Sequence, residues 1–411
     1  MATCLFALMC AASLVAAWSP QVASQVRGPI RIGFIAPTTG TFAANGRDML
    51  DAFMMFWEER NFTVAGRRVE ITHEDDVGTP AITITKARKL VEHDKVHILV
   101  GPLTASSGYA IRDYIHSQKI PSVYPIVSAD DITQRQRTPY IIRTGWTSSQ
   151  PAHPFGEWVV RNLPYRRVAT IAYDFAFGHE WVGGFQRTFE ENGGRVVQKL
   201  WPPIGAPDYG PYLAQLRRDI DALFAVFSGG DALRFLDQYR AFGLKARLPM
   251  IGGGTLTDEH ILPQMGDEAL DIITALHYSA VLNTAENRAF AQAYSKKYNR
   301  PPSYYSENTY TAGRFIFEAL QAIRGDVEST ERFLEALRRA EATDAPRGPV
   351  KLDAFQNPIQ NVYIRKVERR GGLLQNTVVF TYRSVSQFWK YAPEDYLKQP
   401  VYTRDFPPVR P

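Results

Sequence analysis

The sequence predicts an α/β protein with two parallel sheets, each covered by helices on both faces. Three observations lead to this class. Short apolar runs, typical of buried strands, alternate with longer amphipathic stretches, typical of helices. This alternation starts near residue 30 and starts again after about residue 147, which indicates two separate sheets. The length of 411 residues, with 45% hydrophobic and 22% charged side chains, is ample for two cores.

The first series opens with a buried strand at Ile30–Ala36, an apolar run that Pro37 ends. Thr79 followed by Pro80 predicts a helix start, because Thr is a good N-cap and Pro is favoured at the first helical position. Further strands are expected at Val69–His73, His97–Val100, Pro121–Tyr124 and Tyr140–Arg143, with helices at Asp48–Arg60, from Thr79 to about His93 and from about Ser107.

The second series repeats this pattern. Its strands are expected at Val168–Tyr173, Arg195–Leu200, Ala222–Phe227 and Pro249–Ile251, with helices at Gly178–Asn192, Tyr209–Arg217 and Asp231–Phe242. The last third of the chain differs: it predicts helices at Thr284–Tyr298, Ser306–Ile323 and Ser329–Arg339, and a hairpin of Asn361–Val367 with Leu374–Tyr382 around Gly371-Gly372. From Pro393 onward the chain is rich in Pro and Tyr without a period, which indicates either an irregular strap over the surface or partial disorder.

The N-terminal segment has the features of a signal peptide. Residues 1–26 carry no charged side chain, and Leu5–Ala17 is an apolar run of suitable length. Small residues at Val22–Ser24 suit cleavage, so we expect residues 1–24 to be removed on export to the periplasm. The basic n-region is missing, and a disordered apolar N-terminus or a weak membrane anchor is the alternative to a signal peptide.

Cysteine usage excludes several classes of site. Both cysteines, Cys4 and Cys10, lie in the expected signal peptide. A mature chain without cysteine has no disulfide scaffold, no thiolate zinc site and no cysteine nucleophile.

Sequence motifs of enzymes are absent: there is no G-x-S-x-G elbow, no P-loop and no G-x-G-x-x-G after the first strand. His179-Glu180 begins a helix, but Gly183 stands where an H-E-x-x-H zinc motif needs its second histidine. We therefore predict no catalytic residue, no cofactor and no metal; an enzyme would need a titratable pair facing a cleft, such as His179 with Asp174. The net charge is +5, but basic and acidic residues are interleaved, so no nucleic-acid partner is expected.

Loops of small residues follow many of the predicted strands. In a doubly wound sheet this edge is where ligands bind, and free N–H groups at the helix starts favour an anion. Such loops in both halves predict a ligand cleft between two lobes. The loops are Thr38–Gly46, Thr104–Gly108, Val127–Asp130, Phe175–Gly178, Ser228–Asp231 and Gly252–Thr255.

The chain also resembles a known family along its length. The segments that carry the resemblance are Ile30–Gly46 (IRIGFIAPTTGTFAANG), Val69–Asp76 (VEITHEDD), Val100–Ser107 (VGPLTASS), Ile120–Ser128 (IPSVYPIVS) and Tyr140–Arg143 (YIIR). In this order they are similar to the leucine/isoleucine/valine-binding-protein family of periplasmic solute receptors, the type I periplasmic binding proteins. The resemblance covers about residues 30–385.

The resemblance implies two Rossmann-like lobes joined by a three-segment hinge, with a small-molecule ligand at their interface. It places hinge crossings near Gly145, Tyr278 and Lys351. The first lobe would comprise residues 30–145 and 279–350, the second lobe residues 146–278 and 351–385, and a C-terminal tail residues 386–411. It further implies a monomer without enzymatic activity, whose closed form is read by an inner-membrane ABC permease.

The family's binding positions carry over only in part. Its loop after the third strand supplies a hydroxyl to the ligand carboxylate; here Ala105 aligns, and either Ser106 or backbone N–H groups and water take that role. Ser128 aligns with the ligand-binding hydroxyl in the family's next loop and is also a hydroxyl residue. The other aligned positions are Ile126, a backbone partner, Asn45, where the family has an aromatic wall, Phe177, a matching aromatic, and Tyr305 at the pocket edge.

One departure concerns the ligand itself. Amino-acid-binding members place a carboxylate where this chain has Gly252–Thr255, and a buried ammonium without a partner is costly. Either Asp231 compensates, or the ligand is an organic acid without an amine. The glycines, including Gly254, would leave room for a bulky ligand body, which Phe177, Tyr278 and Tyr305 would line unless they are core residues. The sequence thus favours an aromatic or aliphatic carboxylate over a branched-chain amino acid; a ligand sensor for a signalling system is a further alternative.

Overall fold

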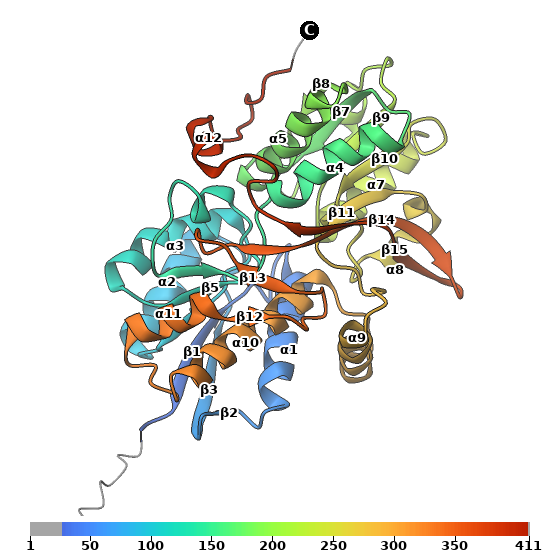
Figure 1. Cartoon of the computed structure of the whole chain (residues 1–411). Helices are drawn as coiled ribbons and strands as arrows, with labels where there is room; N and C mark the ends of the chain where they lie inside the picture. The colour runs from blue at the N-terminus through green and yellow to red at the C-terminus, as the bar shows by residue number, and fades with distance from the viewer. Residues whose placement is uncertain (1–26, 410–411) are drawn as a thin grey trace, which may run out of the picture.

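The computed structural model describes residues 27–409, which form two lobes, each built around one sheet (Figure 1). The predicted signal peptide and both cysteines lie outside the described residues. No helix within residues 27–409 has the length and apolar character needed to cross a membrane.

The first lobe contains a six-stranded sheet in the order β2-β3-β1-β4-β5-β6, parallel except for the short β2. Its strands are β1 (Ile30–Ile35), β2 (Thr63–Val64), β3 (Arg67–Glu74), β4 (Ile98–Val100), β5 (Ser122–Tyr124) and β6 (Ile141–Arg143). The connecting helices are α1 (Ala43–Glu58), α2 (Pro80–Arg88), which continues as a π-helical turn at Lys89–His93, and α3 (Ala105–Gln118), and a 3-10 turn spans Asp130–Thr133.

The second lobe contains a nine-stranded sheet in the order β12-β13-β14-β11-β10-β9-β7-β8, with β15 paired to β14. Strands β7 (Arg167–Ala172), β8 (Arg195–Leu200), β9 (Ala222–Val226), β10 (Met250–Gly253) and β11 (Ile273–Leu276) run parallel. The antiparallel strands are β12 (Glu341–Ala342), β13 (Val350–Leu352), β14 (Pro358–Arg370) and β15 (Leu373–Val385). Its helices are α4 (Ser149–Asn162), α5 (Ala176–Glu191), α6 (Gly210–Leu213), α7 (Gly229–Ala241) and α8 (Leu262–Met265), with 3-10 turns at Gly254–Thr257 and Gly266–Ala269.

The chain passes from the first sheet to the second after β6, leaves the second sheet after β11 and returns to it at β12. After β11 it forms α9 (Ala285–Tyr298), α10 (Tyr304–Ala322) and α11 (Thr330–Arg339), and α10 packs along α1 of the first lobe. The predicted fold class, two doubly wound lobes joined by a hinge, is confirmed.

The C-terminal hairpin is longer than predicted, since each of its strands has 13 residues. Beyond it, residues 386–409 include one short helix, α12 (Pro393–Lys398), and otherwise follow an irregular path over the surface. We call residues 386–409 the C-terminal strap, and of the two alternatives for the tail the strap is the correct one.

Candidate functional site

A small cavity lies between the two lobes, at the carboxyl edges of both sheets. Its volume is about 30 Å³. The first lobe contributes side chains from the loops after β1, β4 and β5 and from the start of α10, and the second lobe from the loops after β7 and β9. The lining residues are Phe42, Leu103, Thr104, Ala105, Ile126, Ser128, Tyr173, Phe175, Phe177, Ser228, Tyr304 and Tyr305.

Helix N-termini surround this cavity. Helices α1, α3, α5, α7 and α10 each begin at or directly after a lining residue: Phe42, Ala105, Phe175, Ser228 and Tyr304 respectively. The first N–H groups of a helix lack intrahelical acceptors, and the helix dipole is positive at that end. The backbone therefore makes this cavity a favourable place for a negative charge.

None of the lining side chains is charged, and half of them are aromatic. A ligand ammonium buried here would have no carboxylate partner among the lining residues, which is unfavourable. A ligand anion, in contrast, would face helix N-termini and the hydroxyl groups of Thr104, Ser128 and Ser228. The lining thus combines apolar surface with groups that can bind an anion.

Of the ten ligand-binding positions predicted from the sequence, five line the cavity, namely Ala105, Ile126, Ser128, Phe177 and Tyr305. Ser128 is well positioned, because the Ser148 hydroxyl donates to its hydroxyl (2.9 Å) and the Ser148 N–H donates to its carbonyl oxygen (2.8 Å), which fixes the loop. Ser106 lies beside the cavity rather than in its lining, with its hydroxyl 3.3 Å from that of Thr104.

Asn45 is completely buried and lies close to the lining residue Tyr305. Neither its amide nitrogen nor its amide oxygen has a hydrogen-bond partner. Burial raises the pKa of the Tyr305 phenol, and the nearby Ser228 and Asn45 side chains act in the opposite direction, which places all three groups at one polar corner. Buried amides without partners are rare, so this corner offers both a donor and an acceptor to a ligand.

Asp231 does not line the cavity, and its carboxylate already has partners within the protein. It accepts a hydrogen bond from the Gly205 N–H (2.8 Å) and forms an ion pair with Arg234 (2.6 Å). This geometry does not favour the sequence-based idea that Asp231 compensates for the missing acid.

The glycines Gly252–Gly254 do not leave the room that the sequence suggested. A β-carbon at Gly254 would collide with Leu276 and Arg365, and one at Gly253 would lie 3.3 Å from the Trp181 ring. Arg365 of β14 is fully buried and donates hydrogen bonds to the carbonyls of Gly254 (2.6 Å) and Tyr278 (2.8 Å). Gly254 and Tyr278 therefore belong to a packed layer beneath the cleft and are not among the lining residues.

Trp146 is a residue that sequence reasoning missed. It follows β6 at the first passage between the lobes and is 1% exposed. Its ring centroid lies 6.2 Å from that of Phe177, 5.8 Å from that of Trp181 and 5.7 Å from that of Tyr304. It thus joins aromatic side chains of both lobes beside the cavity. A tryptophan next to a predicted hinge glycine was the available signal.

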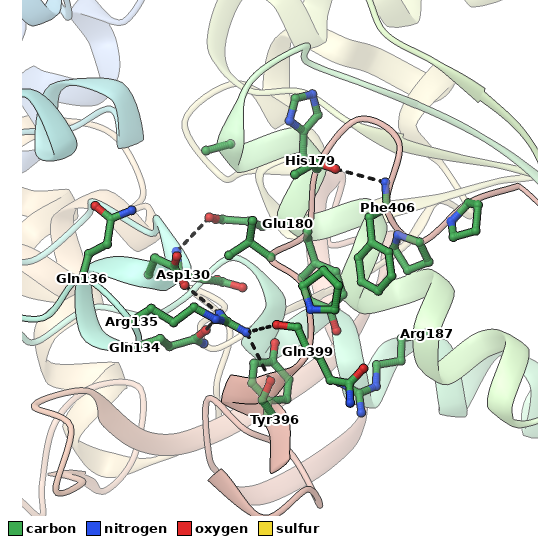
Figure 2. Close-up of a pocket in the computed structure, with 18 of the residues that line it drawn as sticks. Asp130, Gln134, Arg135, Gln136, His179, Glu180, Arg187, Tyr396, Gln399 and Phe406 are labelled. Atoms are coloured by element: carbon green, nitrogen blue, oxygen red, sulfur yellow. Dashed lines mark hydrogen bonds and ion pairs between the residues drawn. The ribbon is translucent and has the colours of Figure 1, made fainter. Parts of the chain in front are cut away.

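A second, larger cavity of about 620 Å³ lies beneath the C-terminal strap, between the 3-10 turn at Asp130–Thr133 and helix α5 (Figure 2). The sequence-predicted pair His179 and Asp174 is formed, at 2.9 Å, but His179 lines this second cavity and Asp174 also pairs with Arg404 of the strap. The pair therefore does not face the interlobe cavity. Within residues 27–409 no group of three or more His, Cys, Asp or Glu side chains is arranged to hold a metal ion.

Two carboxyl groups, Asp130 and Glu180, meet across the lobes at this second cavity. The Asp130 N–H donates to Glu180 Oε1 (3.0 Å), and the second oxygen of each carboxyl has no partner. Burial, opposed by hydrogen bonds from Ser149, raises the pKa of Asp130 to about 6, and burial together with the Asp130 charge raises the pKa of Glu180. Since both pKa values are raised in the folded state, these groups stabilise the fold at low pH, and the contribution of Asp130 is lost as the pH rises through about 6.

Glu180→Gln is therefore expected to raise the free energy of unfolding by about 1–3 kcal/mol at pH 8 and to have little effect at pH 5. Glutamine keeps the oxygen that accepts the Asp130 N–H. Urea denaturation of both proteins at the two pH values measures this difference. An equal effect at both pH values would show that the carboxyl pair does not titrate as described.

Comparisons with known proteins agree with this architecture. A family model described as periplasmic binding protein matches residues 29–372. The Leu/Ile/Val-binding protein homolog 6 of Brucella melitensis is 27% identical over 347 residues, 83% of this chain and 88% of that protein. An ABC transporter substrate-binding protein from Sphaerobacter thermophilus is 34% identical, with a TM-score of 0.82, over 87% of this chain and 99% of that chain.

A solute-binding protein of an ABC transporter from Rhodopseudomonas palustris BisB5, in complex with 3,4-dihydroxybenzoic acid, is 30% identical. The match has a TM-score of 0.84 and covers 87% of this chain and 98% of that chain. The resemblance predicted from the sequence is confirmed: the chain belongs to the periplasmic binding protein family and is a type I member similar to the leucine/isoleucine/valine-binding proteins.

Proposed function

We propose that the protein captures an aromatic carboxylate without an amine in the interlobe cavity and delivers it to an ABC transporter. The observation that carries this proposal is the cavity lining, which combines helix N-termini and aromatic rings with no charged side chain. An anion is stabilised there by the backbone, whereas an ammonium has no partner. The Rhodopseudomonas relative, crystallised with a dihydroxybenzoic acid, supports the same ligand class.

In this proposal the start of α3 and the Ser128 hydroxyl bind the ligand carboxylate. The N–H groups of Ala105 and Ser106 lie in the first turn of that helix, where intrahelical acceptors are lacking. The aromatic ring of the ligand packs against Phe177, Phe175 and Tyr305, which supply apolar contact area and favourable edge-to-face geometry. Closure of the lobes then buries the ligand, and the closed monomer is recognised by an inner-membrane permease after export of the mature chain to the periplasm.

Binding of a branched-chain amino acid is the second candidate, because curated relatives such as the Brucella protein carry Leu/Ile/Val-binding names. In this chain it requires an ammonium partner that the cavity lining does not provide. The Asp231 carboxylate is already engaged by the Gly205 N–H and by Arg234.

Thermal unfolding of residues 25–411 against a ligand panel tests the proposal. The panel contains benzoate, 4-hydroxybenzoate, 3,4-dihydroxybenzoate, an aliphatic acid, leucine and valine. A ligand at a hundred times its dissociation constant stabilises the folded protein by about 2.7 kcal/mol, which is a visible shift. We expect shifts with the aromatic acids only. A shift with leucine or valine and none with the aromatic acids would contradict the proposal.

Asn45→Leu is expected to remove selectivity for hydroxylated rings while retaining benzoate binding. The wild type, with a free amide at the polar corner, should bind 4-hydroxybenzoate about tenfold more tightly than benzoate. In the variant the two dissociation constants should become equal, as measured by calorimetry. Because leucine replaces a buried amide without partners, the ligand-free variant should also be about 1 kcal/mol more stable. Unchanged selectivity would exclude Asn45 from ligand recognition.

A further inference from the structure

The C-terminal strap extends beyond the segment that the family model matches, which ends at residue 372. In Figure 1 it is the red segment that follows β15, forms α12 beside α5 and then continues along the second lobe as far as residue 409. Its path therefore touches both lobes outside the hinge strands.

Many contacts hold the strap on the second lobe. Tyr402 is the central one: its hydroxyl lies 3.0 Å from His153 Nε2, and its ring covers Gly183 so closely that a β-carbon there would collide with it. The other contacts are Lys390 with Glu157 (2.7 Å), Tyr391 with Glu191 (2.5 Å), Arg404 with Asp174 (2.8 Å), Gln186 with the Pro408 carbonyl (3.0 Å) and Lys199 with the Pro407 carbonyl. Since these contacts are numerous, loss of one leaves the strap in place.

The first lobe holds the strap mainly through one residue, Arg135. Its guanidinium donates hydrogen bonds to the carbonyls of Tyr396 (3.2 Å) and Gln399 (2.7 Å) (Figure 2). It also donates to the Leu397 carbonyl (3.2 Å), and Asp131 fixes it through an ion pair of 2.8 Å. A second contact joins the Thr133 hydroxyl to the Gln387 side chain, at 3.2 Å. Both residues belong to the segment between β5 and β6, and so to the first lobe.

The strap also lies next to the ligand cavity. The cavity beneath it and the interlobe cavity are separated by the first turn of α5, where Ala176 lines the former and Phe177 the latter. On the first lobe, Asp130 lines the cavity beneath the strap and Ser128 lines the interlobe cavity. Any separation of α5 from the Ser128–Asp131 loop therefore pulls the strap away from Arg135.

We propose that the C-terminal strap is a latch between the lobes, which opposes opening of the cleft and prolongs the residence of a bound ligand. The latch depends on Arg135, because opening must break its hydrogen bonds to the strap carbonyls, whereas the second-lobe contacts move with the strap. The inference rests on the proposed hinged closure around a ligand and is independent of the ligand's identity.

Distances between labels on the two lobes test the latch in the ligand-free, full mature protein. Asp113 on α3 and Asp237 on α7 have side chains that are 85% and 75% exposed, so each accepts a cysteine and a spin label. The only cysteines of the sequence are Cys4 and Cys10, in the segment expected to be removed, so labelling is specific. The Arg135→Ala variant is the test, removal of residues 386–411 is a second test, and Arg404→Ala, which cuts one second-lobe contact, is the matched control.

We expect Arg135→Ala and the truncated chain to shift the distance distribution toward longer distances, and Arg404→Ala to leave it unchanged. With 4-hydroxybenzoate as the probe, the dissociation rate should rise about tenfold in Arg135→Ala and remain at the wild-type value in Arg404→Ala. Unchanged distances in Arg135→Ala, or an equal shift in Arg404→Ala, would overturn the latch. If 4-hydroxybenzoate does not bind, the proposed ligand class fails, but the label distances still decide for or against the latch.

Discussion

The Arg347→Leu variant is expected to lose about 3–5 kcal/mol of unfolding free energy. Arg347 and Glu307 are both completely buried, and their side chains form an ion pair of 2.8 Å. Removing the guanidinium leaves the Glu307 carboxylate in the interior without its charge partner, which is far more costly than losing an exposed pair. Urea denaturation at pH 7 measures the loss.

Arg347 also connects segments that meet at the hinge. Its guanidinium donates to the carbonyl of Thr144 and to Asn308 Oδ1 (2.5 Å), and its carbonyl accepts a hydrogen bond from the Tyr363 hydroxyl (2.7 Å). These partners lie after β6, on α10 and on β14. The variant should therefore also widen the distribution of distances between the two lobes, in addition to lowering the free energy of unfolding.

Arg339→Leu is the matched control for this variant. Arg339 pairs with Glu335 at 2.6 Å, but the two side chains are 78% and 59% exposed, so the loss should stay within about 0.5 kcal/mol. The double variant Arg347→Leu/Glu307→Leu should recover part of the stability, since it removes the stranded charge. Equal losses in Arg347→Leu and Arg339→Leu would contradict the role of burial.

Ser128→Asp is expected to weaken binding of aromatic carboxylates at least about a hundredfold. Ser128 lines the interlobe cavity and is 4% exposed, so the new carboxylate would lie beside the ligand carboxylate in a site shielded from water. Two like charges placed next to each other weaken the free energy of binding by several kcal/mol. Calorimetric titration with benzoate measures the effect. The same variant supplies an ammonium partner, so weak binding of leucine should appear.

Ser106→Asp is the control, because Ser106 is a neighbouring hydroxyl that lies beside the cavity lining. It should weaken benzoate binding by less than about tenfold, since its charge is partly solvated. Ser128→Ala, which removes only a hydroxyl, should also cost less than about tenfold. If Ser106→Asp abolishes binding while Ser128→Asp does not, the carboxylate of the ligand lies elsewhere in the cleft.

Most of the fold was predictable, because buried parallel strands produce distinct apolar runs. Helix α4 was missed, since Pro151 and Pro154 break the usual helical signal although both lie inside the helix and are buried. Pro151 lies in the first turn of α4, where a missing N–H breaks no intrahelical hydrogen bond. The remaining turns of α4 are stabilised by packing against α5. Strand β11 was missed because its four residues form no apolar run distinct from their surroundings.

The candidate site was predictable at the level of loops and less so at the level of side chains. The loops at Thr104–Gly108, Phe175–Gly178 and Ser228–Asp231 all reach the cavity, as strand edges in a doubly wound sheet must. The space beside Gly254 was not predictable, because Arg365 fills it from β14, more than a hundred residues away in sequence. Long-range packing of this kind leaves no local pattern.

A cavity of about 30 Å³ is far smaller than the pockets of about 300–1,000 Å³ that usually hold small-molecule ligands. Opening must therefore precede binding, and at high ligand concentration the observed association rate should reach a plateau set by the opening rate. At equilibrium, the apparent dissociation constant equals the intrinsic constant divided by the fraction of ligand-free molecules that are open. A substitution far from the cavity that favours the closed ligand-free form would thus weaken apparent affinity and leave every ligand contact intact.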